Sequence, residues 1–228
     1  MNRYRRRILE ISRTVPALHI GGAFSCIEIV HTIYRELMAE GDTFILSKGH
    51  GAMAQYVVLE EMGVKPAMHA HPERGTPGIS ASTGSLGHGL GIAVGIAHAD
   101  PAHNVYVVIS DGELQEGSTW EAVMLARTLH VANLLIFVDC NGMGSLGRMP
   151  AALYPVAEKF KAFRLDAMDV DGHSVWSIKD SAGFLKKPGA LICWTVKGKG
   201  VSFMENEPIW HYRSPNDEEY AKAMKELA

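Results

Sequence analysis

The sequence predicts an α/β fold, a three-layer sandwich with a mostly parallel central sheet. Two continuous runs of β-branched and aromatic residues, VYVVIS (105–110) and LLIFVD (134–139), have the apolar character of strands buried on both faces. The stretch between them, STWEAVMLARTLH (118–130), has the pattern of a helix. A strand, a helix and a strand in this order predict a right-handed parallel crossover unit.

Near the N-terminus the sequence predicts a helix, a loop and a second helix. Residues 3–14 place apolar side chains among arginines at helical spacing. Pro16 and the glycine pair at 21–22 interrupt this pattern, which predicts a loop. Ser25 is in position to cap the next helix, with a glutamate three residues later as in a capping box. We expect this second helix to end before Gly41.

The middle of the chain alternates short regular elements with one long irregular segment. The stretch TFILSKGHG (43–51) predicts a short strand, and residues 52–62 continue with helical periodicity. Residues 64–88 contain three prolines, several glycines and three histidines, and such long irregular segments are usually functional or mobile. Residues 89–99 predict a helix of small side chains. A further strand and a surface helix with an acidic first turn are expected at 190–197 and 217–227.

Composition predicts one soluble globular domain and excludes several classes of protein. A chain of 228 residues fits a single domain, and a net charge of −3 gives no electrostatic basis for binding nucleic acid. No apolar stretch reaches membrane-spanning length, and interruptions after the basic N-terminus argue against a signal peptide. Cys26, Cys140 and Cys193 are widely spaced and odd in number, which indicates neither a disulfide framework nor a zinc site. A cytoplasmic protein is expected.

Polar residues stand at the ends of the two buried strands. Asp111 follows the first strand and Asn141 the second, so both lie at the carboxyl edge of the expected sheet, where open α/β sheets bind ligands. Carboxylate and amide oxygens suit magnesium or calcium, and Gly112 allows the backbone to approach a diphosphate. A helix cap at Asp111 and an Asn-Gly turn explain the same residues without a ligand. Their spacing of thirty residues leaves both explanations open.

Longer blocks of the sequence resemble a known family. SDG (110–112) followed by Asn141 is similar to the signature of thiamine diphosphate enzymes, a GDG with an asparagine some thirty residues later. Further blocks resemble, in order, the N-terminal domain of the transketolases, and they span nearly the whole chain. These blocks are LHIGGAFS, FILSKGHGA, HPE, STGSLGHGLGIAVGIA, SDGELQEGSTWEA, VDCNGM and VKGKGVSFMEN with a later WH.

Among transketolases the chain resembles the N-terminal subunit of enzymes that are split into two polypeptides. This resemblance implies a single diphosphate- and metal-binding domain over residues 1–228, with thiamine diphosphate and Mg²⁺, or Ca²⁺ or Mn²⁺, as cofactors. It implies that the pyrimidine-binding domain, with the glutamate that activates the cofactor, lies on a separate C-terminal subunit. Paired active sites then imply an α2β2 assembly that is inactive unless both chains are present.

The resemblance also implies a role for individual residues, each carried over from a matching block. The implied metal ligands are Asp111, Asn141 and, through its carbonyl, Met143. The implied cofactor-binding residues are His50, Gly84, Leu86, Gly112, Glu113 and Asn141. The implied catalytic residues are His19, His71 and His211, placed around the sugar, and Glu116, which links paired active sites.

Four of the eleven histidines differ from the rest in their sequence context. His19, His50, His71 and His211 each lie in a segment marked by glycine or proline, where functional residues are concentrated. Near neutral pH, histidine can both donate to and accept from hydroxyl groups. This property suits a site that binds a sugar.

Four other positions depart from the family or stay open. Ser110 replaces the first glycine of the signature, and metal binding by the neighbouring aspartate is expected to persist. His88 stands where the family commonly has glutamine, and we expect it to alter hydrogen bonding or substrate choice. Lys48 faces either solvent or a phosphate, and Lys197 belongs either to the site or to an exposed loop.

The resemblance implies a transferase of the transketolase type. We expect it to move a two-carbon ketol unit from a ketose, expected to be phosphorylated, to an aldose. The partners would be sugar or sugar-phosphate substrates and the second subunit, with no nucleic acid and no membrane. Two alternatives remain open: a thiamine diphosphate enzyme of specialised metabolism that forms acyloins or decarboxylates its substrate, and a noncatalytic binding subunit.

Overall fold

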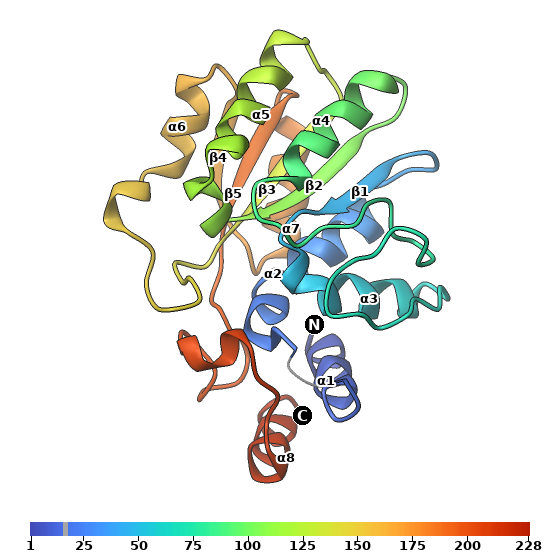
Figure 1. Cartoon of the computed structure of the whole chain (residues 1–228), viewed down its shortest axis with the longest axis vertical. Helices are drawn as coiled ribbons and strands as arrows, with labels where there is room; N and C mark the ends of the chain where they lie inside the picture. Colours follow the sequence, from blue (N-terminus) through green and yellow to red (C-terminus); the bar gives the residue numbers. More distant parts are fainter. Residues whose placement is uncertain (16–17) are drawn as a thin grey trace.

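A central sheet of five parallel strands organises the computed structural model, which describes residues 1–15 and 18–228 (Figure 1). The strands lie in the order β1-β2-β3-β5-β4, and each neighbouring pair is parallel. The predicted α/β class with a parallel sheet is confirmed. The expected interruption of the N-terminal helical pattern at Pro16 lies outside the described residues. The bounds are β1 Thr43–Leu46, β2 Val105–Ser110, β3 Leu134–Cys140, β4 Asp166–Asp171 and β5 Gly189–Trp194.

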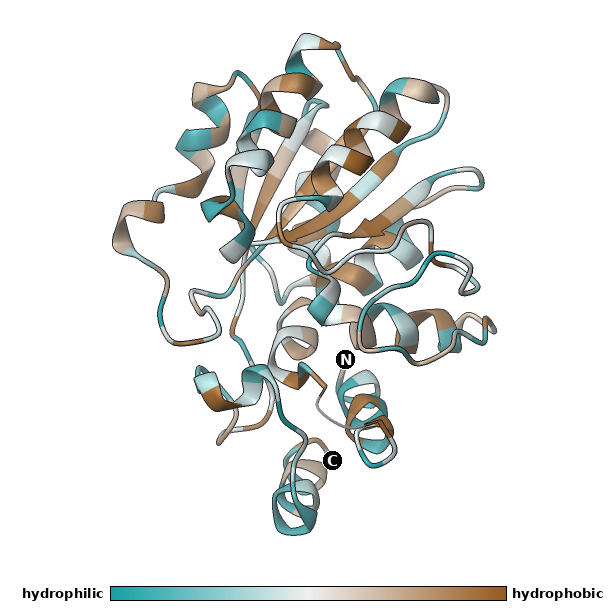
Figure 2. Cartoon of the chain, viewed as in Figure 1, coloured by the Kyte–Doolittle hydropathy of each residue, from teal (hydrophilic) through white to brown (hydrophobic). Residues whose placement is uncertain are grey.

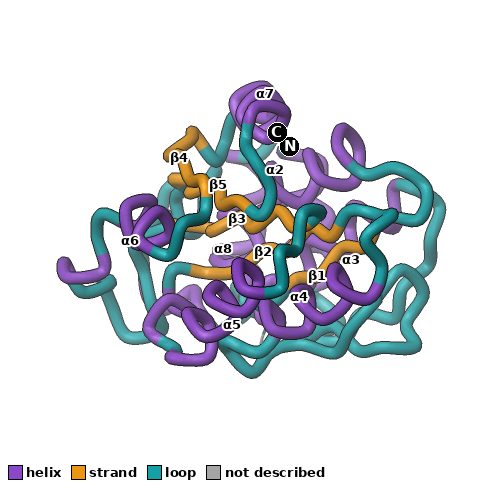
Figure 3. Tube along the Cα trace, turned by 90° about the horizontal axis from the view of Figure 1, so that it is seen from above, coloured by secondary structure: helices purple, strands orange, loops and turns teal. Residues whose placement is uncertain are grey.

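Helices cover both faces of this sheet, as Figure 3 shows from above. One face carries α4 (Gly89–Ala99), α5 (Gly117–Thr128) and α6 (Val156–Ala162). The other face carries α2 (Ile20–Thr32) and α7 (Val175–Phe184). Both α1 and α3 pack against α2, and α8 packs against α1. The bounds of these three helices are α1 Asn2–Ile11, α3 Ala52–Glu61 and α8 Asp217–Glu226.

The middle strands are buried along their whole lengths because they lie between two helical layers. Successive side chains of a strand point to opposite faces. Tyr106 and Val108 of β2 therefore join the core on the α2 side, and Val105, Val107 and Ile109 join the core on the α4 side. Figure 2 shows the strongly hydrophobic character of these strands, which agrees with the continuous apolar runs expected of parallel strands.

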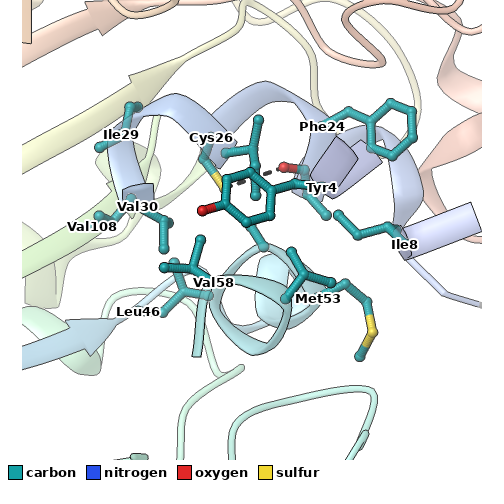
Figure 4. Packing of buried hydrophobic residues seen from close by; sticks show 14 of the residues in the cluster. Tyr4, Ile8, Phe24, Cys26, Ile29, Val30, Leu46, Met53, Val58 and Val108 are labelled. Atoms are coloured by element: carbon teal, nitrogen blue, oxygen red, sulfur yellow. Dashed lines mark hydrogen bonds between the residues drawn. The ribbon is translucent and has the colours of Figure 1, made fainter. Parts of the chain in front are cut away.

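The core on the α2 side ties the N-terminal helix to the sheet. Tyr4 and Ile8 of α1, Phe24 of α2 and Val58 of α3 belong to one cluster with Val108 of β2 (Figure 4). Ile8 and Phe24 are completely buried, and full burial of such a side chain contributes roughly 1.5–3 kcal/mol. The N-terminal helix is therefore an integral part of the domain.

The sequence prediction for the second helix is wrong at its start. α2 begins at Ile20, runs through the glycine pair and passes into a π-helical turn at Ile33–Leu37. Gly21 and Gly22 lie inside the helix at a place where other segments approach it closely. A Cβ atom on Gly22 would lie 2.9 Å from His50 Cδ2. These glycines serve close packing instead of a loop.

The expected capping box at the start of this helix is also absent, because Ser25 and Glu28 lie inside α2. Ser25 Oγ donates to Asp139 Oδ2 at 2.6 Å. Glu28 accepts from the Arg5 guanidinium at 2.8 Å, and both side chains of this ion pair are almost completely buried. Ser25 and Glu28, which match a capping box in the sequence, thus make tertiary contacts instead.

The other predicted elements are confirmed within a few residues. The structure has helices at α1, α3, α4, α5 and α8 and strands at β1, β2, β3 and β5 where the sequence predicts them. Residues 64–88 form no helix or strand, apart from an isolated bridge between Arg74 and Thr76. None of the helices in the described chain is long and apolar enough to cross a membrane.

Candidate active site

A pocket of about 410 Å³ opens at the carboxyl edge of the sheet. The turns that follow β1, β2 and β3 contribute to it, as expected of an open α/β sheet. All of the residues implied by the family resemblance line this pocket except Glu113. The complete lining is His19, Gly22, His50, His71, Gly84, Leu86, Ser110, Asp111, Gly112, Gln115, Glu116, Asn141, Met143, Gly144, Ser145, Met149, Lys197 and His211.

Asp111 lies directly after β2, and the neighbouring backbone fixes its carboxylate. One oxygen accepts from the Gly112 N–H at 2.9 Å, and the other accepts from the Gly142 N–H at 2.6 Å. The side chain is almost fully buried. Burial and the nearby charge of Asp139 raise the pKa of Asp111 to about 6. A bound cation would stabilise the ionised form of this carboxylate.

The turn after β3 brings a second oxygen donor to the same place. Asn141 Oδ1 accepts from the Met143 N–H at 3.0 Å, and Asn141 Nδ2 donates to Asp139 Oδ2 at 3.2 Å. This arrangement orients the amide, and Met143 lines the pocket beside it. A carboxylate and an amide oxygen form a donor set that fits a hard divalent cation.

A buried ion pair supports these turns from below. Lys48 and Asp139 are completely buried and paired with each other. Lys48 Nζ also donates to Gly22 O at 2.9 Å, and Asp139 accepts from Thr195 Oγ1 at 2.5 Å. Burial lowers the pKa of Lys48, but Asp139 and other neighbours raise it overall. Lys48 therefore faces neither solvent nor the pocket, and the pair joins α2 to the ends of β1, β3 and β5.

Four histidines meet in the pocket from four separate segments. The ring centroid of His19 lies 5.0 Å from that of His211 and 5.6 Å from those of His50 and His71. The Nδ1 atom of His19 is buried and has no hydrogen-bond partner among the described residues. An unpaired buried nitrogen costs free energy unless a ligand or water satisfies it. This atom therefore fits a pocket that binds a polar ligand.

Three of these histidines are uncharged at neutral pH. Burial and the neighbouring His211 lower the pKa of His19 to about 4. Burial and Lys197 lower the pKa of His211 to about 4, and burial places the pKa of His50 well below its ordinary value. Neutral imidazoles can donate one hydrogen bond and accept another, which matches the hydroxyl groups of a sugar.

Two glycine-containing turns, at Gly49 and at Gly84, contact each other beside the pocket. A Cβ atom on Gly49 would lie 2.7 Å from the backbone nitrogen of Gly84, so no side chain fits there. Gly84 has a φ of +135°, a conformation that favours glycine. This backbone contact holds the segments of His50 and Leu86 against each other, and both residues line the pocket.

Glu113 is the implied cofactor-binding residue that the structure does not bring to the pocket lining. Its carboxylate accepts from the Gly87 N–H at 3.0 Å, the Ser110 N–H at 2.9 Å and the Ser47 hydroxyl. The reason is the 3₁₀ turn at Gly112–Gln115, which directs the side chain inward. Glu113 thus ties the 84–88 turn to the end of β2 beneath the pocket.

His88 is exposed at the start of α4 and does not line the pocket. Its expected effect on hydrogen bonding or substrate choice stays a prediction. Glu116 is exposed at the rim, where it precedes α5. An exposed glutamate at the pocket rim is available to a second chain.

The sequence leaves the place of Lys197 open, and the structure puts it in the pocket lining with 2% of its surface exposed. Its ammonium donates to the Gly144 carbonyl at 2.8 Å. Burial and the charge of Lys48 lower its pKa to about 8. The sequence alone assigns no role to the remaining lining residues, of which Gly22 and Gln115 lie in family blocks and Gly144, Ser145 and Met149 do not.

Comparisons with known proteins agree with this geometry. The family model described as transketolase, thiamine diphosphate binding domain, matches residues 14–228. One apulose-4-phosphate transketolase subunit, from Phocaeicola vulgatus, is 34% identical over an alignment of 255 positions, gaps included, which covers 98% of this chain and 91% of the relative. A 6-deoxy-6-sulfo-D-fructose transketolase subunit of Clostridium sp. (strain MSTE9) is 34% identical, covering 92% and 88%. Human transketolase is 30% identical, covering 92% of this chain and 38% of its own length.

Solved structures show the same fold. The chain superposes on transketolase from Leishmania mexicana with a TM-score of 0.88 at 24% identity, over 99% of its own length. Transketolase from Campylobacter jejuni gives a TM-score of 0.83 at 24% identity, again over 99% of this chain. The chain spans 40% of the Leishmania protein and 42% of the Campylobacter protein.

Proposed function

The chain belongs to the transketolase family, whose thiamine diphosphate-binding domain it matches over residues 14–228, and on this premise we propose that it is one subunit of a two-chain transketolase. The activity we propose is transfer of a two-carbon ketol unit from a ketose to an aldose. Residues 1–228 form the diphosphate- and metal-binding domain in this proposal. The pyrimidine-binding domain is supplied by a partner subunit.

One observation carries the proposal. The Asp111–Asn141 oxygen pair and four histidines line a single pocket of about 410 Å³ at the carboxyl edge of a parallel sheet. The oxygen pair suits the metal of a diphosphate, and the histidines suit a polyhydroxylated substrate. The combination of both features in one pocket favours an enzyme over a noncatalytic subunit.

The residues of this chain divide into two groups around the pocket. Asp111, Asn141 and the Met143 carbonyl would hold Mg²⁺ or a similar cation, which would in turn hold the diphosphate. The residues that we propose against the cofactor are His50, Gly84, Leu86 and Gly112. Thiamine diphosphate, when bound, supplies an electron sink that stabilises a carbanion.

The histidines would handle the sugar. His19, His71 and His211 lie around one space, so they can bind the hydroxyl groups and hold or move protons on the substrate oxygens. The neutral state of His19 and His211 at pH 7 allows donation and acceptance by the same ring.

A sugar that carries an acidic group is the substrate class that we propose. The relative from Phocaeicola vulgatus is named for apulose-4-phosphate, and the relative from Clostridium is named for 6-deoxy-6-sulfo-D-fructose. Among the described residues that line the pocket, Lys197 is the one cationic side chain, and it donates to the Gly144 carbonyl. We therefore propose that the partner subunit binds the acidic end of the sugar.

Two copies of each chain would form the enzyme, with this chain pairing through α4 and α5. Ile92, Met124, Leu125 and Leu129 are large apolar side chains that lie on or directly after these helices and are between 36% and 46% exposed. Ile92 and Leu125 line one shallow groove between the two helices. Glu116 stands at the start of α5, so pairing along this face would bring it near the second copy.

Ketol transfer in a reconstituted mixture tests the proposal. The chain is combined with its partner subunit, thiamine diphosphate and magnesium, and assayed with a panel of phosphorylated and unphosphorylated ketoses and aldoses. We expect transfer only when both chains are present. Cofactor binding without transfer to any acceptor would favour an acyloin-forming or a noncatalytic protein instead.

A matched pair of variants tests the cofactor site. Asp111→Ala should abolish metal-dependent binding of thiamine diphosphate to the two-chain complex, because it removes the buried oxygen donor. Glu158→Ala, an exposed change on α6, should bind the cofactor normally. Tight binding by Asp111→Ala would contradict the metal site.

A further inference from the structure

Lys197 makes two contacts that join the metal-side turn to the sugar-side histidines. Its ammonium donates to the Gly144 carbonyl at 2.8 Å and lies 3.0 Å from His211 Nδ1. Gly144 follows directly on Met143, and His211 ends the 3₁₀ turn at Pro208–His211. A single buried cation therefore touches both halves of the site.

The chemistry of an ammonium fixes the direction of the second contact. A protonated lysine has three donors and no lone pair, so it can only donate. His211 Nδ1 must then accept with its own lone pair, and the ring proton of the neutral imidazole must reside on Nε2. The 3.0 Å separation is a normal hydrogen-bond length for this donation.

The order in which the two groups lose their protons supports this direction. Burial and Lys48 lower the pKa of Lys197 to about 8. Burial and Lys197 itself lower the pKa of His211 to about 4. At neutral pH the lysine is therefore charged and the imidazole neutral. The reverse arrangement, in which the histidine donates to a neutral amine, needs a higher pH.

We propose that Lys197 is a positioning residue that fixes His211 as the Nε2–H tautomer. The nitrogen of His211 that remains for a ligand is then a hydrogen-bond donor and cannot accept a proton. This inference rests on the proposed function for its consequence: His211 donates to a sugar oxygen and does not act as a base.

His19 would take the complementary role. Its Nδ1 atom has no hydrogen-bond partner among the described residues, so no contact from this part of the chain selects its tautomer. Its ring lies edge to face with His211, with centroids 5.0 Å apart. Of these two neighbouring histidines, His19 is therefore the one that can either give or take a proton.

Nitrogen-15 NMR of the full chain, with labelled histidine, tests the tautomer directly and needs neither cofactor nor activity. Comparison with His211→Gln assigns the signals of His211. At pH 7 we expect Nδ1 to be unprotonated and hydrogen-bonded, and Nε2 to carry the proton. A protonated Nδ1 in the unaltered chain would overturn the proposal.

Removal of the ammonium gives the second measurement. In Lys197→Met we expect the pKa of His211 to rise by roughly one unit, because a neighbouring cation is lost, and the hydrogen-bond signature at Nδ1 to disappear. Lys199→Met is the matched control, since Lys199 is 41% exposed and pairs with Glu205 instead. An unchanged Nδ1 signal and an unchanged pKa in Lys197→Met would overturn the assignment.

Activity of the two-chain enzyme separates this proposal from a role in cofactor binding alone. Lys197→Met should lower kcat for ketol transfer together with the change in His211. Lost cofactor affinity with an unaltered His211 spectrum would assign Lys197 to the diphosphate and reject the positioning role. If no ketol transfer is found for any variant, the spectra still decide the tautomer, so the two proposals fail independently.

Discussion

At the scale of single residues, His19 occupies the middle of the candidate active site. The centroids of three other histidine rings lie within 5.6 Å of its own, and its buried Nδ1 has no partner in the described part of the chain. The ring of His19 lines the pocket, and its Nδ1 makes no hydrogen bond to the described residues that would stabilise the fold. Substitution should therefore affect turnover more than stability.

We expect His19→Gln to lower kcat for ketol transfer by roughly 100-fold, a typical loss for a group that transfers or holds a proton. Binding of thiamine diphosphate should be retained, because the metal-side residues are untouched. Steady-state kinetics and cofactor titration of the two-chain enzyme provide the measurement. His103→Gln, a change in the exposed turn before β2, serves as the control. Equal kcat values for the two variants would rule out a role for His19 in turnover.

For Glu113 we expect substitution to affect stability more than turnover, because its carboxylate lies beneath the pocket. Glu113→Ala leaves the buried N–H groups of Gly87 and Ser110 without their acceptor. We expect the free energy of unfolding to fall by roughly 2–4 kcal/mol, the cost of unpaired buried donors. Urea denaturation measures the change against Glu158→Ala, which loses only an exposed ion pair with Lys161. A loss no larger than the control's would show that the Glu113 contacts are dispensable.

The oxygen donors of the site are easier to predict from the sequence than the residues that support them. Asp111 and Asn141 could be predicted from their places after two recognisable strands, because the carboxyl ends of parallel strands meet at one edge. The sequence could not show that Glu113 and Lys48 lie outside the pocket. Both belong to segments that line the pocket, but their side chains point into the core. The direction of a side chain in a turn depends on partners that are distant in the sequence, here Gly87 and Asp139.

At the scale of elements, α2 shows how close packing can override a sequence pattern. Its two glycines predict a loop, yet they lie in a helix, and a Cβ atom on either would come within 3.1 Å of Trp210 or His50. The start of α2 is thereby coupled to the pocket that His19 and His50 line.

A pair of glycine substitutions distinguishes packing from helix propensity. Gly22→Ala places a Cβ atom 2.9 Å from His50 Cδ2, so we expect His50 to be displaced and cofactor affinity to fall about tenfold or more. Gly95→Ala on α4 meets no atom within 4 Å and should stabilise the helix by up to about 1 kcal/mol. Cofactor titration and thermal unfolding check the two outcomes. Unaltered cofactor affinity in Gly22→Ala would mean that the pocket tolerates the shift.

Elements with strong periodicity are predictable from the sequence, and weakly patterned ones are not. β4 has the sequence DAMDVD, lies at the sheet edge and buries only Ala167 and Val170, so it lacks the apolar run of β2 and β3. The acidic first turn of α8 is expected from the sequence, but the capping box lies here, at Asn216 and Glu219, and not at Ser25. A capping motif has too few residues to be unique within one chain.

At the scale of the whole molecule, two half-buried histidines of the pocket make the free energy of unfolding depend on pH. His19 and His211 have folded-state pKa values of about 4, below the ordinary value of 6.5. As pH falls below 6.5, the unfolded chain binds protons that the folded chain excludes, so the free energy of unfolding decreases. The decrease continues until about pH 4, where the folded chain also binds them.

We expect this acid sensitivity to weaken when both histidines are replaced. Urea denaturation of the full chain between pH 7.5 and 4.5 should show a shallower decline for the His19→Gln, His211→Gln double variant than for the original chain. The difference is bounded by about 1.4 kcal/mol per pH unit for each histidine and is reduced by partial solvent exposure. Comparing the two proteins removes the contribution of carboxylates such as Asp111. Parallel declines would contradict the lowered pKa values.

The edge of the parallel sheet opposite the pocket offers a position for a label. Every strand points its carboxyl end toward the pocket, so the turns that lead into the strands lie at the opposite edge. Residues 100–104 before β2 form such a turn, and Asp100, Pro101 and Ala102 are exposed. A fluorophore or affinity handle attached there would leave the pocket edge untouched, so it could be used to follow binding of the proposed partner subunit.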